Sequence, residues 1–226
     1  MNNFDGQLNL YPEICIDNFD TNCLFNSKIK CYILSHFHDD HMKNLEDINF
    51  YKVLKEGSYD GVKFLVSPIT KNFISICGKY KHITEFCHEV TCESPIIVRI
   101  SDKESVTVTF CGSGHCPGSV MVFIEGSRGN VLFTGDFRLP SNSASRLPFL
   151  KDTKSNETKR VDDLYMDMTF FKTEVPYIPG REESAKALID FIHRFLNLKK
   201  GSCNDSVPVN GFQDLIYLKT SARIGN

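Results

Sequence analysis

Short runs of apolar residues, separated by turn-forming residues, recur along most of this chain. Their β-branched and aromatic side chains are typical of buried β-strands. Such runs cover residues 10–19, 31–34, 62–66, 106–110, 120–124, 131–134, 164–167 and 215–218. Between two of them, Ser67 and Pro68 are the residue types of an N-cap and a first helical position, so we expect a helix over residues 68–77. The alternation of strands with a helix predicts an α/β layered domain.

The pattern is different in four other segments. Residues 44–55 fit no single element, and residues 140–160 are polar and turn-rich, which predicts a loop. Residues 181–196 carry apolar side chains at helical spacing and two glutamates in the first turn, so we expect an amphipathic helix there. Residues 201–210 read as a loop.

Composition places few limits on the class of protein. Hydrophobic residues make up 41% of the 226 residues and charged residues 24%, which is ordinary for a globular chain. No apolar stretch approaches the roughly 20 residues that a membrane span needs, and the first residues do not resemble a signal peptide. We therefore expect the nine cysteines to be reduced thiols. The net charge of −2 gives no sign of a nucleic-acid-binding protein, so any DNA contact would need a local basic groove.

The strongest chemical signal lies in residues 35–41, Ser-His-Phe-His-Asp-Asp-His, directly after an apolar run. A hydrophobic core could not absorb these imidazoles and carboxylates unpaired. In an extended segment His36 and His38 point the same way, so they can bind one cation together. Asp40 and His41 follow where the chain can turn, and they can face a second cation. Imidazoles and carboxylates without thiolates suit zinc in an open catalytic site; the alternative is a solvated junction between strand and loop.

Other candidate ligands also follow predicted strands. His115 lies in a glycine-rich loop after residues 106–110, and Asp136 comes directly after residues 131–134. Functional side chains of α/β layered folds commonly lie on loops at strand ends, so we expect these two to join the first group. Asp17 and Asp167 also follow strands. From the residues alone, Asp17 reads as a turn aspartate and Asp167 could equally be a surface aspartate.

The motif His-x-His-x-Asp-His after a strand resembles the signature of the metallo-β-lactamase superfamily. The flanking segments Ile-Asp-Asn-Phe at 16–19, Gly-His-Cys-Pro-Gly-Ser at 114–119 and Thr-Gly-Asp-Phe-Arg at 134–138 resemble its β-CASP branch, and in particular the DNA cross-link-repair nucleases. This resemblance implies an α/β metallo-β-lactamase αββα sandwich with the start of an incomplete β-CASP insertion. It implies a metallo-β-lactamase domain over residues 1–160. Residues 161–226 would then hold the last motif strand and the beginning of a truncated β-CASP region.

The resemblance also implies roles for individual residues. One or two Zn²⁺ ions would be bound by six metal ligands, with Asp136 shared between two groups. These ligands are His36, His38, Asp40, His41, His115 and Asp136. Asp40 would also accept a proton from the attacking water, and Asp17 would hold a ligand imidazole in its orientation. Asp167 would enter the site from the last motif strand, although Met168 follows it where the family usually has threonine.

Three functions fit these residues and the resemblance, which implies the first of them. The first is a metal-dependent DNA nuclease, a 5′-exonuclease or structure-specific endonuclease that hydrolyses phosphodiesters in double-strand break or cross-link repair. Its implied partners are DNA hairpins, overhangs and 5′ ends, with a DNA-dependent protein kinase acting through regions absent here, and its implied location is the nucleus. The second is another hydrolase of the same fold that acts on RNA or a thioester. The third is an inactive truncated product.

Overall fold

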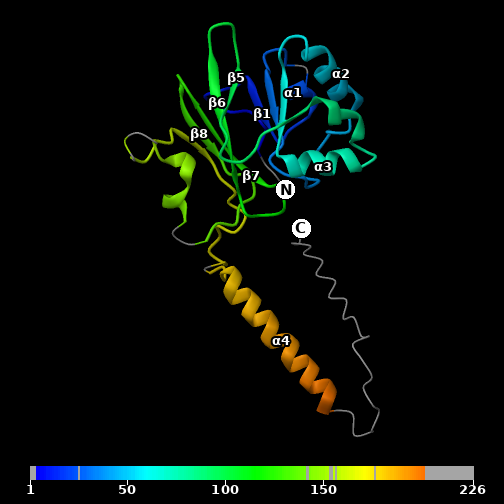
Figure 1. Cartoon of the computed structure of the whole chain (residues 1–226), viewed down its shortest axis with the longest axis vertical. Coiled ribbons are helices and arrows are strands. Elements are labelled where there is room, and N and C mark those ends of the chain that lie inside the picture. The colour runs from blue at the N-terminus through cyan, green and yellow to red at the C-terminus, as the bar shows by residue number, and fades with distance from the viewer. Residues whose placement is uncertain are drawn as a thin grey trace. The chain divides into compact units, whose positions relative to one another are not determined.

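Two β-sheets form the framework of the chain in Figure 1, a computed structural model. The structure describes residues 4–24, 26–140, 143–152, 155, 157–175 and 177–201. The chain divides into two compact units, Met1–Lys172 and Thr173–Asn226. Both sheets lie in the first unit.

The first sheet has four parallel strands in the order β1-β2-β3-β4. These strands are β1 (Ile14–Ile16), β2 (Cys31–Ile33), β3 (Lys63–Val66) and β4 (Cys87–Glu89). The connections between them carry α1 (Thr21–Leu24), α2 (Ile48–Gly57), α3 (Pro68–Ile76) and the 3₁₀ helix η1 (Lys81–Phe86). The helices α2 and α3 lie on the outer face of this sheet (Figure 1).

Alternation of side chains explains why this sheet is covered on both faces. Tyr32 and Phe64 belong to the apolar cluster shared with the helices, whereas Ile33 and Leu65 belong to the cluster shared with the second sheet. Successive side chains of a strand point to opposite faces, so each strand contributes to both clusters. A parallel sheet needs this double cover, which is why its strands read as continuous apolar runs.

The second sheet has the order β5-β6-β7-β8-β9 and faces the first. Its strands are β5 (Ile96–Arg99), β6 (Ser105–Gly112), β7 (Val120–Gly126), β8 (Gly129–Phe133) and β9 (Asp163–Tyr165). The strands β5 to β8 pair antiparallel, and β9 pairs parallel to β8. Its outer face packs against a short segment with two 3₁₀ helices, η2 (Ala144–Arg146) and η3 (Pro148–Leu150), through Phe149.

The predicted α/β two-sheet architecture is confirmed. The expected strands in the first 167 residues are present, and α3 begins at Pro68 with Ser67 accepting a hydrogen bond from the Thr70 backbone. The undecided segment 44–55 holds most of α2, which is N-capped by Asp47. The segment 140–160, expected to be only a loop, also contains η2, η3 and a bridge between Lys151 and Thr158. The expected loop over 201–210 and strand over 215–218 lie, apart from Gly201, outside the described residues.

The division at residue 160 stays a prediction. Residues 161–172 are part of the first unit, because β9 extends the second sheet. In the second unit the expected helix is present as α4 (Arg181–Gly201), with exposed apolar side chains such as Leu188, Ile189 and Phe191. No helix among the described residues has the length and apolar character to cross a membrane.

Candidate metal centre

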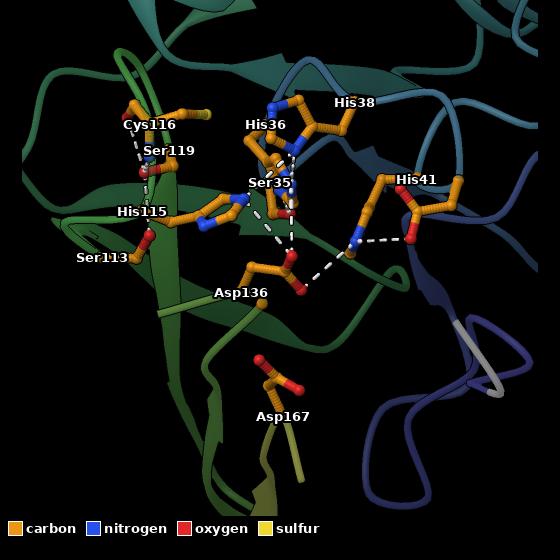
Figure 2. Close-up of polar contacts among 12 residues, drawn as sticks. Ser35, His36, His38, His41, Ser113, His115, Cys116, Ser119, Asp136 and Asp167 are labelled. Atoms are coloured by element: carbon orange, nitrogen blue, oxygen red, sulfur yellow. Dashed lines mark hydrogen bonds and ion pairs between the residues drawn. The ribbon is translucent and has the colours of Figure 1, made fainter. Parts of the chain in front are cut away.

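The candidate ligands come together because the strands that precede them end at one edge of the two sheets. Ser35 and His36 follow β2, His115 follows β6, and Asp136 follows β8. The two sheets are joined at this edge by a hydrogen bond from the Val120 backbone N–H to the Ser35 carbonyl, 3.0 Å long. Figure 2 shows these side chains pointing toward one another.

The first group of ligands consists of three imidazoles and a carboxylate. His38 Nδ1 lies 3.1 Å from both His36 Nε2 and His115 Nε2. Asp136 Oδ2 lies 3.3 Å from His115 Nε2 and 3.9 Å from His36 Nε2. These four atoms all lie within 4.8 Å of one another. Convergence of three ring nitrogens and one carboxylate oxygen fits the donor set of a transition-metal ion such as zinc.

The second group lies on the other side of Asp136. His41 Nε2 is 3.4 Å from Asp136 Oδ1 and 3.8 Å from Asp40 Oδ2. Asp136 therefore presents Oδ2 to the first group and Oδ1 to the second, which is the arrangement that a bridging carboxylate requires. The Asp40 side chain is 52% exposed, whereas that of His41 is buried. Each group thus has one exposed member, His38 in the first and Asp40 in the second.

Burial and hydrogen bonding set different protonation states for the histidines. Burial lowers the pKa of His36 to about 4, so this imidazole is neutral at pH 7. Burial also lowers the pKa of His115. For His41, burial acts in the same direction, but hydrogen bonds to Asp136 and Asp17 outweigh it and raise its pKa to about 10. The same bond to His41 lowers the pKa of Asp136 to about 2. A positive charge is thus stabilised where the second cation would bind.

Asp17 lies beside His36 and His41 and has a fully buried side chain. Its Oδ2 is 2.8 Å from His41 Nδ1, so it holds the ring by the nitrogen that faces away from Asp136 and Asp40. Its carboxylate also accepts hydrogen bonds from the backbone N–H and the hydroxyl of Ser35. Asp17 also lies within ligand distance of His36 and His41. Because its oxygens already accept these three hydrogen bonds, we assign it to positioning.

Asp167 lies at the same edge but apart from the two groups. Figure 2 places it beside Asp136. Its carboxylate accepts hydrogen bonds from the backbone and hydroxyl of Thr169 and is 3.8 Å from Arg138 Nη1. Among the described residues it makes no contact with the clustered histidines. The structure therefore brings together seven of the eight predicted site residues and leaves Asp167 at their border.

A serine network shapes the loop that carries His115. The Ser119 hydroxyl accepts from the Cys116 backbone N–H, at 3.0 Å, and from the Ser113 hydroxyl, at 2.9 Å (Figure 2). The Gly118 carbonyl in turn accepts a 2.7 Å hydrogen bond from Ser67, the N-cap of α3. Sequence reasoning missed the roles of Ser113, Ser119 and Ser35. The only signal in the sequence was the concentration of hydroxyl residues beside the candidate ligands.

Gly135, which precedes Asp136, has a backbone conformation that other residues seldom adopt. Its φ is +50°, and a Cβ there would lie 3.1 Å from the Ser35 hydroxyl oxygen. Gly135→Ala is expected to lower the free energy of unfolding by about 1–3 kcal/mol. Chemical denaturation measures this loss. Gly78→Ala is the control, because a Cβ there meets open space and the expected change is within about 0.5 kcal/mol. Equal effects of the two substitutions would contradict this account.

Together, the two facing sheets and the His/Asp cluster define an α/β protein with a candidate divalent-metal centre, as the resemblance to the metallo-β-lactamase superfamily implies. The chain is 37% identical to protein artemis of Rattus norvegicus over 201 residues, which cover 87% of this chain and 28% of that protein. It is 28% identical to 5′ exonuclease Apollo of the same species over 166 residues, which cover 74% of this chain and 27% of that protein. The resemblance predicted from the motifs is therefore confirmed.

Two other comparisons complete these findings. No family model matches the chain. The metallo-β-lactamase fold protein YhfI from Bacillus subtilis, a solved structure, aligns with 62% of this chain and 55% of its own at 18% identity and a TM-score of 0.41. The chain spans about 28% of the length of the artemis proteins it matches.

Proposed function

We propose that this chain carries the metal centre of a DNA nuclease that hydrolyses phosphodiester bonds in double-strand break or cross-link repair. The observation that carries the proposal is the position of Asp136, whose two oxygens face two separate groups of ligands. Two adjacent metal ions are the usual means of stabilising both the attacking and the leaving oxygen of a phosphoryl transfer. The name of one relative, 5′ exonuclease Apollo, supports a nucleic acid as the substrate.

We infer that the metal is zinc. His36, His38, His115 and Asp136 would hold one ion, and His41, Asp40 and Asp136 the other. Bound zinc supplies a hydroxide nucleophile at neutral pH and neutralises charge on the phosphate. Asp40, which is exposed, would accept the proton of the attacking water. We assign no proton transfer to Asp167, which Thr169 and Arg138 hold beside the cluster.

The substrate proposal is tested by incubating the chain with labelled hairpin DNA and 5′-phosphorylated single-stranded DNA, with and without a chelator. Cleavage that the chelator abolishes and zinc restores is the expected result. Turnover of RNA or a thioester without cleavage of either DNA would replace the nuclease with another hydrolase of this fold. Bound zinc without any turnover would favour an inactive product. Nuclear location and dependence on a DNA-dependent protein kinase are further parts of the proposal, and localisation and kinase-addition experiments test them.

Zinc content provides a test that does not depend on turnover. His38→Ala is expected to lower the bound zinc measured by elemental analysis, because His38 Nδ1 lies between two other ligand nitrogens. A ligand at a hundredfold excess over its Kd stabilises a folded protein by about 2.7 kcal/mol, so the same substitution should reduce the stabilisation by added zinc. His82→Ala is the matched control, since this exposed histidine lies with its ring tilted against Tyr51, outside the cluster. Equal zinc content in both variants would refute the assignment.

A further inference from the structure

Ser35 lies between Asp17 and His36 and is fully buried. Its hydroxyl is 2.5 Å from Asp17 Oδ2 and 2.9 Å from His36 Nδ1. We infer that Ser35 is a positioning residue. Its hydroxyl forms a hydrogen-bond relay between Asp17 and His36, whereas Asp17 contacts His41 directly. One carboxylate would then orient a histidine in each of the two ligand groups. This inference rests on the proposed function, because it assigns Ser35 a part in building that metal centre.

The direction of the hydrogen bonds follows from the number of protons available. A carboxylate only accepts, so the single hydroxyl proton of Ser35 is donated to Asp17. Toward His36 the hydroxyl oxygen must therefore accept, which places a proton on His36 Nδ1. His36 Nε2 then carries the lone pair, and it is the atom that faces His38 and Asp136. The relay thus fixes the tautomer that metal binding requires.

The same carboxylate acts on His41 without an intermediate. His41 Nδ1 donates to Asp17 Oδ2, so Nε2 faces the second group. The hydroxyl of Ser35 therefore serves His36 alone, and Asp17 serves both rings. This difference predicts that loss of the Ser35 hydroxyl affects one ligand group and that loss of the Asp17 carboxylate affects two.

The backbone holds the relay in place. Asp17 has a φ of +53°, an uncommon conformation that Asp and Asn adopt more readily than most residues. Its backbone N–H continues the pairing of β1 with β2 by donating to the Ile33 carbonyl. The Ser35 backbone N–H donates to Asp17 Oδ1 at 2.7 Å, which fixes the carboxylate at a second point. Because both side chains are buried, water has little access to replace the hydroxyl.

The experiment compares wild type with Ser35→Ala, Ser35→Thr and Thr109→Val. Thr109→Val deletes a buried hydroxyl of β6 and is the control. Nitrogen chemical shifts of ¹⁵N-histidine-labelled, metal-free protein report the tautomer of His36, and titration with zinc reports affinity. We expect Ser35→Ala to lose the Nδ1–H form of His36 and to bind zinc about 10–100-fold more weakly. Ser35→Thr should restore both, and Thr109→Val should change neither.

The outcomes separate the relay from the proposed function. An unchanged His36 tautomer in Ser35→Ala would overturn the relay, and so would an unchanged zinc affinity. If wild type cleaves no DNA while Ser35→Ala still changes the tautomer and the zinc affinity, the relay holds and the nuclease proposal fails. The backbone amide spectrum of Ser35→Ala shows whether this variant folds. If it does not fold, failure of the Ser35→Thr variant to keep the wild-type tautomer would overturn the inference.

Discussion

Replacing Asp136 with asparagine is expected to lower DNA hydrolysis by roughly a thousandfold, because stabilisation by a metal pair contributes several kcal/mol. The Asp136 side chain faces both ligand groups, with Oδ2 near His115 and Oδ1 near His41. An asparagine keeps one oxygen and turns an amide N–H₂ toward the other group, where it cannot coordinate a cation. The measurement is kcat/KM on labelled DNA, together with the amount of zinc bound per chain.

Asp39→Asn is the matched control for this substitution. Asp39 belongs to the same motif and is exposed, and no contact of its carboxylate with the cluster is found in the described part of the chain. Its replacement removes the same negative charge at a position between the ligands His38 and Asp40, so a general electrostatic effect would appear in both variants. We expect wild-type kcat/KM and zinc content for Asp39→Asn. Similar losses in the two variants would mean that Asp136 acts through charge alone and does not bridge.

The sequence predicted which residues form the candidate site, but not the contacts that hold them in place. His36, His38 and Asp40 were found because they lie together in the chain. His115 and Asp136 were reached only by assuming that strand ends meet, and the structure brings His115 to 3.1 Å from His38 across 77 residues. Local patterns carry no information about such distances. Assignment of these residues as ligands stays a prediction, which the zinc measurements test.

Asp17 and Ser35 show where local patterns fail. Asp17 read as a turn residue from the sequence, and its backbone does have the left-handed conformation that such residues adopt. Its role arises from contacts with Ser35 and His41, 18 and 24 residues away. A hydroxyl beside a histidine is common, and only the packing of β1 against β2 turns it into a hydrogen-bonded link. Side-chain relays of this kind depend on tertiary structure.

The secondary structure of the undecided segment 44–55 could not be predicted for a similar reason. Phe50 and Leu54, four residues apart, are buried against the first sheet, but Tyr51 and Val53 between them are apolar as well. Apolar residues at consecutive positions hide the helical period, so the pattern fits strand and helix alike. The helix forms because Asp47 caps its start and because the aromatic side chains on this face of the sheet would be exposed without it.

Phe64→Ala is expected to lower the free energy of unfolding by about 3–5 kcal/mol, the usual loss for a buried aromatic side chain. Phe64 is fully buried in β3. Its ring packs in T-shaped pairs with Phe19 and Phe50, at centroid distances of 5.9 and 5.3 Å. After the substitution, the helices cannot fill the space left by the Phe64 ring without losing contact with the rest of the sheet, so a cavity remains. Denaturant titration of metal-free protein measures the loss.

Phe171→Ala is the control, because that ring is 80% exposed and its removal should change stability by no more than about 0.5 kcal/mol. Phe64 belongs to the cluster under the helices and contacts none of the candidate ligands in the described residues. The Phe64→Ala protein that remains folded should therefore bind as much zinc per chain as wild type. A loss of zinc at unchanged stability would show instead that the aromatic cluster positions the metal centre, and equal stability losses in both variants would refute the cavity argument.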